Sequence, residues 1–578
     1  GSLRAWACMP RLNDWSAAVE KVVARQKQAG ARVWEIWNEP NLLSFWSPEP
    51  SPEEYTQFLI ASYKAIKRAD PQALVLGCSL AGPNGLRYTK PYEFVEEVLK
   101  RGGGQAKDAI SIHPYRQPRT PEESGYLEDL QAISDLTAKY GRRLPIWITE
   151  VGWPTDPSGS SESRSAQLLV RSYSLAMAHG VENIAWYDYH DDGVDPTYNE
   201  HHFGILYNDL TPKPSYFAYR TLATELAGRR FQREVAAGDG VSVLVFGNGE
   251  RREAVAWSHR GTRQLAFQVG DRRRLETVDL MGNPQEAPVV DGVWLATLDE
   301  TPVFLRDVPV SLAAIRPIDA SPAILKVLPG ESRSLEVTLR NPFSVPVHLT
   351  WAKETVELPA GGEKRITLTR TAEAWVSGIE PWRSANGLSF VVPAQVVMLE
   401  GRREPILRYD AETSKSIELP DSSGANVTDE VTVAARFRSQ GPTGTWESLA
   451  TKWKGEHRNW GVFLGRENGD LSFSASFAKG PGSFMDIGSN HSLFDGQWHR
   501  VAVTYSAHDA EVCFYVDGKL VRRVPRDGGK LLTNQGPVSL AGGFTDPRVQ
   551  PPKPQAAVSH LRVWNRALSA EEVRELRN

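Results

Sequence analysis

The most constraining feature of this sequence is a regular alternation of strand-like and helix-like segments that continues to about residue 228. Short apolar runs alternate with longer amphipathic stretches, which is typical of a parallel sheet whose strands are joined by crossover helices. The expected strands are residues 3–9, 33–38, 73–80, 109–113, 144–149 and 183–187. The pattern therefore predicts a (β/α) barrel, a fold whose active sites lie at the C-terminal ends of the strands.

Six strands are two fewer than a closed (β/α)8 barrel of the TIM type requires. If Glu39 ends the fourth strand, the first two β/α units are missing from this chain. An open six-stranded sheet would leave two unpaired edges, which natural proteins avoid. We therefore expect residues 1–228 to be an N-terminally incomplete barrel, either because the sequence begins inside a longer protein or because the missing units come from elsewhere.

After residue 228 the helical pattern stops, and short strand-like runs follow one another between Gly, Asn and Asp turns. A chain of 578 residues is too long for one hydrophobic core and should divide into three or four domains. The alternation predicts β-sandwiches at residues 229–308 and 309–405. Residues 406–578 are again all-β and end in a short helix, so the chain is expected to be multidomain.

Two glutamates end tryptophan-containing strands of the barrel region. Glu39 and Glu150 lie 150 − 39 = 111 residues apart, which is 37 residues for each of three β/α units. Cleavage of a glycosidic bond needs one carboxyl group that protonates the leaving oxygen and one ionised carboxylate that attacks the sugar or activates water. The pair therefore predicts a glycoside hydrolase.

Several polar and aromatic residues near the strand ends are candidate substrate contacts. They are Asn38, His113, Tyr115, Trp186, Trp153, Phe45 and Trp46. Aromatic rings offer flat apolar surfaces for sugars, but core packing is the alternative for each of them. A single glutamate at a strand end is also often only a solvated rim residue. Glu35 is interpreted as structural, because strand alternation places it on the side of Glu39 but deeper in the barrel.

The motifs around the two glutamates resemble those of clan A glycoside hydrolases. Residues 37–41, Trp-Asn-Glu-Pro-Asn, resemble the motif that ends the fourth barrel strand, and residues 147–153 are similar to the seventh-strand segment. The resemblance implies that Glu39 is the general acid/base and that Asn38 binds the 2-hydroxyl of the sugar. It also implies that Glu150 is the nucleophile.

The segment between these two motifs points to one family within the clan. The His-Pro-Tyr sequence of residues 113–115 resembles family 39 of the clan. This implies that Tyr115 contacts the nucleophile and that His113 lies near the acid/base. The resemblance covers residues 3–228 and departs from the family in lacking the first two strands.

The later modules resemble known β domains. Residues 309–405 resemble an immunoglobulin-like module, and residues 495–503, 514–519 and 561–568 resemble a laminin G-like, concanavalin A-like jelly roll. Jelly rolls of this kind bind glycans, bind calcium or only pack against a neighbour. A structural calcium ion and a glycan platform made by Trp453 and Trp460 are therefore candidates.

Composition argues against nucleic-acid binding, a membrane span and a disulfide-rich fold. The balance of 66 Lys+Arg against 70 Asp+Glu leaves no basic field for nucleic acid. No apolar run approaches the roughly 18 residues of a membrane span. The odd set of Cys8, Cys78 and Cys513 implies no disulfide framework.

We therefore expect a secreted or cell-surface retaining glycoside hydrolase that cleaves β-glycosidic bonds of a poly- or oligosaccharide and needs no cofactor. The alternative is a non-catalytic carbohydrate-binding or adhesion protein with a degenerate barrel. The presence of both Glu39 and Glu150 argues against that alternative. The sugar, the linkage, exo or endo action and the oligomeric state stay open at this point.

Overall fold

The structure is a computed structural model that describes most of the chain between residues 8 and 576. The residues outside this description are 1–7, 83–90, 158, 250, 323, 352–353, 378, 380, 385–387, 399–403, 420–421, 423–424, 442–445, 455–456, 466–468, 478–483, 526–528, 542–555 and 577–578. The chain forms two compact units. One contains residues 1–321, 336–367 and 380–393, and the other contains residues 322–335, 368–379 and 394–578.

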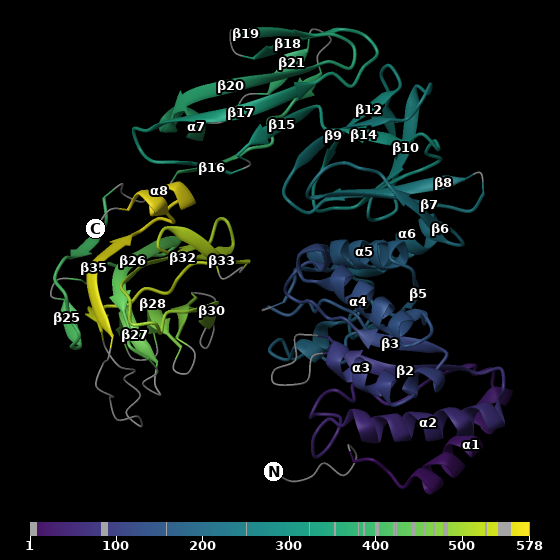
Figure 1. Cartoon of the computed structure of the whole chain (residues 1–578). Helices are drawn as coiled ribbons and strands as arrows, with labels where there is room; N and C mark the ends of the chain where they lie inside the picture. The colour runs from purple at the N-terminus through teal and green to yellow at the C-terminus, as the bar shows by residue number, and fades with distance from the viewer. Residues whose placement is uncertain are drawn as a thin grey trace. The chain divides into compact units, whose positions relative to one another are not determined.

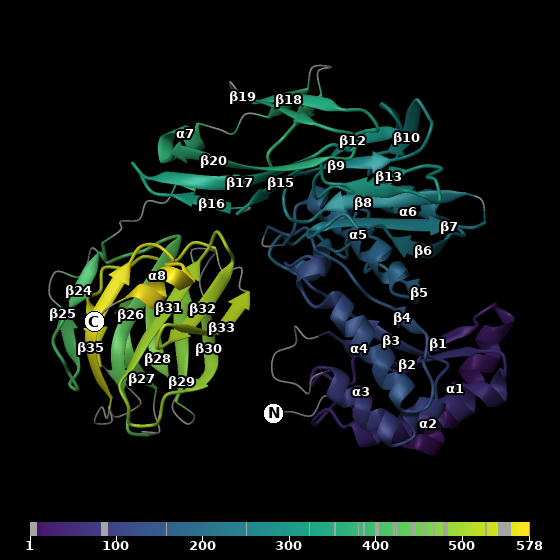
Figure 2. The same cartoon turned by 45° about the horizontal axis from the view of Figure 1, so that its top comes forward.

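The first unit begins with a five-stranded parallel sheet whose strands follow one another in chain order (Figures 1 and 2). The strands are β1 Val33–Glu35, β2 Leu74–Ala81, β3 Ala109–His113, β4 Ile146–Ile148 and β5 Val181–Ile184. The helices are α1 Leu12–Gln28, α2 Pro52–Ala69, α3 Pro91–Lys100, α4 Tyr126–Lys139, α5 Glu162–Ala178 and α6 Pro214–Leu226. The expected partial (β/α) barrel is confirmed as a parallel half barrel. The strand expected at residues 3–9 lies outside the described residues, except that Cys8 forms an isolated parallel bridge with Ser47.

The centre of this sheet is buried on both faces, whereas its two outer strands carry exposed residues. Strands β2 and β3 are almost continuous apolar runs whose residues lie in the core, as expected for inner parallel strands. Each of β1 and β5 pairs with only one neighbour among the described residues. Val33 on β1 is 45% exposed, and Glu182 on β5 is also exposed. Within the described residues, the outer edges of β1 and β5 therefore have no pairing strand.

Antiparallel sheets follow the half barrel within the same unit. The first has the order β11-β10-β13-β8-β7-β6, and the second has the order β12-β9-β14. Their strands are β6 Arg230–Glu234, β7 Val241–Gly247, β8 Arg252–Ser258, β9 Arg263–Gln268, β10 Arg274–Val278, β11 Pro284–Pro288, β12 Val293–Leu298, β13 Val303–Leu305 and β14 Ala313–Ile315. Leu244, Phe246 and Val255 belong to the same hydrophobic cluster as the half-barrel helices. These sheets therefore share a continuous core with the half barrel.

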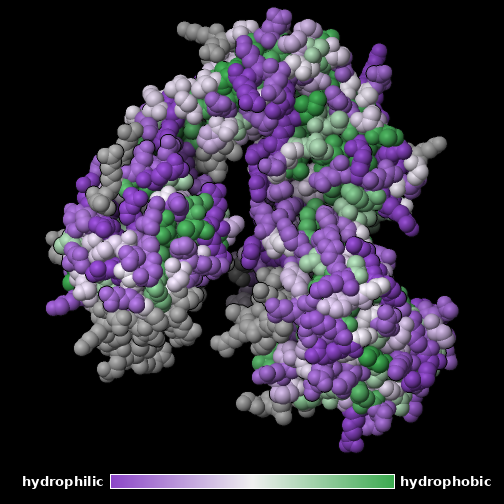
Figure 3. All heavy atoms as spheres, in the orientation of Figure 1, coloured by the Kyte–Doolittle hydropathy of each residue, from purple (hydrophilic) through white to green (hydrophobic). Residues whose placement is uncertain are grey.

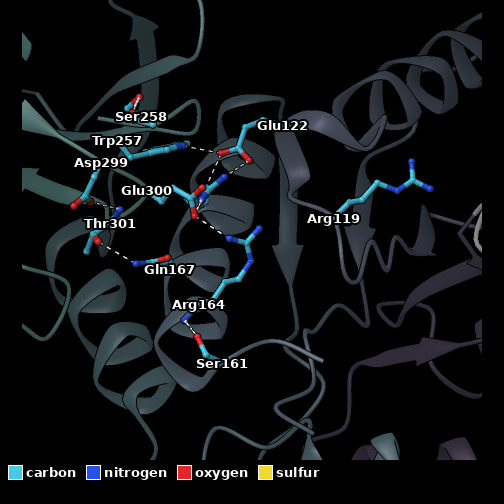
Figure 4. Close-up of polar contacts among 12 residues, drawn as sticks. Arg119, Glu122, Ser161, Arg164, Gln167, Trp257, Ser258, Asp299, Glu300 and Thr301 are labelled. Carbon is cyan, nitrogen blue, oxygen red and sulfur yellow. Dashed lines mark hydrogen bonds and ion pairs between the residues drawn. The ribbon is translucent and has the colours of Figure 1, made fainter. Parts of the chain in front are cut away.

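A buried polar cluster reinforces this junction (Figure 4). The fully buried Arg171 on α5 donates to both carboxylate oxygens of Glu122, at 2.8 and 2.7 Å. The indole Nε1–H of Trp257 on β8 donates to the same carboxylate at 2.7 Å. Nearby, Arg164 pairs with Glu300 at 2.9 Å. Arg171 is therefore paired with Glu122, and Arg164 with Glu300, at this junction.

Three smaller sheets come next, with the orders β15-β17-β20, β16-β23 and β19-β18-β21-β22. Their strands are β15 Ile318–Ser321, β16 Ile324–Val327, β17 Ser332–Arg340, β18 Val347–Trp351, β19 Glu354–Leu358, β20 Glu363–Thr371, β21 Trp382–Ser384, β22 Ser389–Phe390 and β23 Gln395–Met398, with the short helix α7 Ala372–Val376. The β-rich region predicted after residue 228 is confirmed, and the individual domain boundaries stay predictions.

The second unit ends in two six-stranded antiparallel sheets packed face to face (Figure 2). One sheet contains β24 Leu407–Tyr409, β35 Ala557–Trp564, β26 Glu430–Arg438, β31 His499–Ser506, β32 Glu511–Val516 and β33 Lys519–Pro525. The other contains β25 Ile417–Leu419, β34 Val538–Leu540, β27 Glu447–Lys454, β28 His457–Leu464, β29 Asp470–Ser476 and β30 Phe484–Ser492. Helix α8, Ala570–Glu575, begins with a capping box in which Ser569 and Glu572 satisfy each other's backbone N–H groups. The expected jelly roll is confirmed.

Trp460 is fully buried in this jelly roll, and its Nε1–H donates to the carbonyl of Ala425 at 3.2 Å. The expectation that Trp460 is a glycan platform is therefore wrong, because its ring belongs to the core. Hydrophilic residues dominate the surface in Figure 3, with small hydrophobic patches between them. None of the helices in the described part of the chain is long and apolar enough to cross a membrane.

Candidate active site

Glu39 is held by a tight turn after β1. The strand ends at Glu35, earlier than expected, because Trp37 and Glu39 both have positive φ values, 69° and 45°. Positive φ is costly for residues other than glycine and persists only where neighbouring contacts enforce it. Here the Glu39 N–H donates to the carbonyl of Ser79 at 2.9 Å. The buried Asn41 then exchanges two hydrogen bonds with the backbone of Ala81, at 3.2 and 3.0 Å.

The end of β2 carries a bulge that turns a polar side chain toward the site. The register with β3 shifts between Gly77 and Leu80, and Cys78 and Ser79 have φ values of 87° and 41°. Bulges often re-aim side chains beside active sites. In this case the Ser79 hydroxyl lies 3.2 Å from Nε2 of His113.

His113 brings the two glutamates together. It ends β3, its side chain is only 1% exposed, and its Nδ1 lies 3.0 Å from Oε1 of Glu39 and 3.5 Å from Oε2 of Glu150. One oxygen of each carboxylate and one nitrogen of His113 all lie within 4.8 Å of one another. The structure therefore places Glu39, His113 and Glu150 in one cluster at the C-terminal ends of the strands.

Glu150 follows β4 and has a dedicated hydrogen-bond donor. The hydroxyl of Tyr115 donates to Oε2 of Glu150 at 3.0 Å. The ring of Tyr115 is fixed by edge contacts with Tyr187 and Phe203, at centroid distances of 6.4 and 5.8 Å. Tyr115 therefore occupies the position beside the second glutamate that the sequence predicts.

The cluster perturbs the protonation of its own members. Burial raises the pKa of Glu150, while the charge of His113 and the hydrogen bond from Tyr115 act in the opposite direction. Burial disfavours the charged form of His113, but the hydrogen bond with Glu39 and the negative charges of Glu150 and Glu39 outweigh it and raise the pKa of His113. Burial and the neighbouring Glu150 raise the pKa of Tyr115, so its hydroxyl keeps the proton that it donates.

Two residues that the sequence analysis did not select also contact this cluster. Oγ1 of Thr149 lies 3.1 Å from Nε2 of His113, and its hydroxyl donates to Oε1 of Glu35 at 2.8 Å. Ser79 contacts the same nitrogen. Because the Thr149 proton goes to Glu35, Thr149 accepts from His113 and favours a proton on Nε2. Their positions at strand ends are the only sequence signal that could have identified Ser79 and Thr149.

The aromatic candidates divide into two groups. Trp46 and Trp153 are fully buried, and their Nε1–H groups donate to Glu54 and to the carbonyl of Arg119. Their rings have no free face for a sugar, which corrects the expectation of outer subsites at these two positions. Trp186, which stacks on Trp153 at 6.0 Å, is only partly buried.

Phe45 and Asn38 are likewise partly buried. Both stay candidates for substrate contact together with Trp186.

The same three side chains, Glu39, His113 and Glu150, form a geometry that could hold a metal ion. The donor set mixes two carboxylates with an imidazole that is already hydrogen-bonded to Glu39. Direct hydrogen bonding among the three groups and Tyr115 accounts for this arrangement, so acid/base chemistry is sufficient to explain it.

Two parts of the chain match known protein families. Residues 6–215 match the family described as the glycosyl hydrolase catalytic core, and residues 411–574 match the concanavalin A-like lectin/glucanases superfamily. A β-xylosidase of Geobacillus stearothermophilus is 23% identical over 230 residues, covering 36% of this chain and 45% of that protein. A glucan 1,3-β-glucosidase of Candida albicans is 30% identical over 184 residues, covering 28% of this chain and 59% of that protein.

The chain thus spans about half the length of these two curated relatives. Among solved structures, a family 39 glycoside hydrolase from Bacteroides cellulosilyticus WH2 is 26% identical with a TM-score of 0.44, covering 50% of this chain and 61% of that one. The first unit therefore contains a glycosyl hydrolase catalytic core, and the chain ends in a concanavalin A-like domain. The expected resemblance to glycoside hydrolases is confirmed by the match of residues 6–215 and by the β-xylosidase relative.

Proposed function

We propose that this protein hydrolyses β-glycosidic bonds of an oligo- or polysaccharide with retention of configuration, with Glu150 as the nucleophile and Glu39 as the general acid/base. The observation that carries the proposal is the contact of both carboxylates with one buried nitrogen of His113. Oxygens of the two carboxylates lie within 4.8 Å of each other. Retaining enzymes hold their carboxyl groups about 5–5.5 Å apart, whereas inverting enzymes separate them by roughly 6.5–9.5 Å to admit a water.

The surroundings of the two glutamates support different roles for them. Glu150 accepts a hydrogen bond from Tyr115, which stabilises a carboxylate and suits an ionised nucleophile. Glu39 contacts the same Nδ1 of His113 at 3.0 Å and has no such phenol donor in the described structure. We assign proton donation to Glu39 for this reason.

The reaction follows from these roles in two steps. Glu150 attacks the anomeric carbon while Glu39 gives its proton to the departing glycosidic oxygen, and a glycosyl ester forms on Glu150. Glu39, now ionised, removes a proton from a water molecule that attacks the ester and releases the sugar. His113 stays within hydrogen-bond reach of Glu39 in both protonation states, because its Nδ1 can accept from the acid or donate to the carboxylate.

Chemical rescue by azide tests these assignments with aryl β-xylosides and β-glucosides, the sugars that the names of the relatives suggest. Glu150→Gly should be inactive alone and should form the α-glycosyl azide, because azide enters from the side that the nucleophile has vacated. Glu39→Gly should form the β-glycosyl azide, because azide attacks the glycosyl ester without base assistance. The opposite assignment of the two azide anomers would reverse the proposed roles. An absence of turnover in every variant and in the unmodified protein would favour a non-catalytic carbohydrate-binding protein instead.

A further inference from the structure

The outer face of the jelly roll contains a small pocket beside α8. It has a volume of about 50 Å³ and is lined by Ala434, Ala435, Arg436, Arg500, Val501, Ala502, Gly518, His560, Arg562, Val573 and Leu576. The pocket exists because Ala434 on β26 and Ala502 on β31 are direct cross-strand partners and their side chains are too short to fill the space between larger neighbours. Figure 2 shows α8 lying against this sheet.

Positively charged side chains surround Ala434 and Ala502, which form the floor of the pocket. Arg436 and Arg500 are also direct cross-strand partners, and Arg562 is the partner of Ala434 on the other side. Like charges directly opposite each other on neighbouring strands destabilise a sheet. Three arginines and His560 thus line one cavity, and no acidic side chain is among its described lining residues.

The acidic side chains near the pocket act on its three arginines to different extents. Arg562 forms an ion pair with Asp410 on the outside. The guanidinium of Arg500 donates to the carbonyl of Leu576 at 3.1 Å, and its charge acts on the carboxylate of Asp517, which also accepts the backbone N–H of Arg500 and pairs with His499. Within the described part of the chain, Arg436 has no acidic partner.

Trp498 holds Arg436 in place, because the guanidinium carbon of Arg436 lies 5.2 Å from the centre of the Trp498 ring. The guanidinium of Arg438 lies 5.0 Å from the same ring. Cation–π contacts of this kind orient an arginine without neutralising its charge. The donors of Arg436 are therefore positioned for an anion from outside the protein.

We propose that this arginine pocket binds the carboxylate of a uronic acid residue in an acidic glycan. A cavity of about 10–15 Å³ on this measure already holds one water molecule, so the pocket has room for a carboxylate. Arginine forks bind carboxylates through paired N–H donors. The alanine floor accepts the apolar C–H edge next to the carboxyl group. That a glycan carries the anion rests on the proposed function, whereas the anion site itself does not.

Titration calorimetry on the full chain at fixed salt tests the pocket. The ligands are a glucuronate-containing oligosaccharide, the same oligosaccharide with its carboxyl groups reduced to alcohols, and a sulfated oligosaccharide of equal length. The acidic form should bind about tenfold or more tightly than the reduced form. Equal affinity for the acidic and reduced forms would overturn the proposal, and preference for the sulfated form would replace a carboxylate site by a sulfate site.

Variants distinguish the pocket from general attraction by positive charge. Arg436→Gln removes the unneutralised cation, and Ala434→Leu fills the cavity while every charge stays, so each should weaken binding about tenfold. Lys530→Gln removes one exposed charge from the same domain and should leave binding unchanged. An equal loss in Lys530→Gln, or full binding in Arg436→Gln, would refute the assignment. Hydrolysis of a small aryl glycoside should be unaltered in all three variants, so failure of the pocket and failure of the proposed activity are separable.

Discussion

The contact between Tyr115 and Glu150 gives the most specific prediction about the catalytic cluster. Tyr115→Phe keeps the ring that packs on Tyr187 and Phe203 and removes only the hydroxyl that lies 3.0 Å from Oε2 of Glu150. A hydrogen bond to a charged group contributes about 1.5–3 kcal/mol. At 1.36 kcal/mol for each factor of ten, kcat/KM should fall roughly 10- to 150-fold.

The pH profile supplies a second readout of the same change. The Tyr115 hydrogen bond lowers the pKa of Glu150 against the opposing effect of burial, so its loss raises the pKa of Glu150 further. The ionised nucleophile then appears only at higher pH, and the acidic limb of the kcat/KM profile should move to higher pH.

Tyr187→Phe is the matched control, because the Tyr187 hydroxyl contacts Glu200 at 3.5 Å instead of Glu150. An unshifted limb with less than a twofold rate change in Tyr115→Phe would refute the reasoning. So would an equal effect of the two substitutions.

Three further predictions concern the surroundings of the site and the junction behind it. Thr149→Val removes the hydroxyl between His113 and Glu35 without changing the shape of the side chain, and steady-state kinetics should show a loss in kcat of about tenfold. Arg171→Met leaves the buried carboxylate of Glu122 without its cation, so denaturant titrations should show a free energy of unfolding lower by about 3–5 kcal/mol. Arg260→Met is the control, because it removes an exposed partner of Glu123 and should change that free energy by less than about 0.5 kcal/mol. Burial alone would raise the pKa of Glu122, but the hydrogen bond and charge of Arg171 outweigh it and lower that pKa. This pair should therefore stabilise the fold at pH values above about 4.3, the ordinary range of glutamate, and its contribution should disappear as acid titrates Glu122 through its lowered pKa.

The sequence was informative where local pattern determines structure. Apolar runs such as residues 109–113 predicted buried parallel strands, because only a strand covered on both faces is apolar throughout. Glu39, His113 and Glu150 could be placed together, because the C-terminal ends of parallel strands meet at one edge of a sheet.

Features that depend on long-range contacts were not predictable from the sequence. No sequence pattern predicts the bulge at Cys78 and Ser79, because the bulge is a shift in how β2 pairs with β3. Trp46 and Trp153 were misjudged for a similar reason. An aromatic residue in a loop looks the same in sequence whether its ring faces a cleft or lies in a core, and here both rings are fully buried.

The half barrel raises the question of whether this chain can bind and turn over a sugar. Both β1 and β5 leave a strand edge unpaired in the described structure, although the cluster of Glu39, His113 and Glu150 is already formed by β1, β3 and β4. If these strands position the catalytic pair by themselves, then the nucleophile should react even where substrate affinity is low.

The most direct test of the central claim is the intact mass of the protein after incubation with 2-fluoro-2-deoxy-β-glycosides bearing a good leaving group. The account predicts one covalent glycosyl adduct per chain, located on Glu150 by peptide mapping and absent in Glu150→Gln. Reactivation by added acceptor sugar should release the adduct and restore the original mass. An adduct on another residue, or one that persists in Glu150→Gln, would contradict the assignment of Glu150 as the nucleophile.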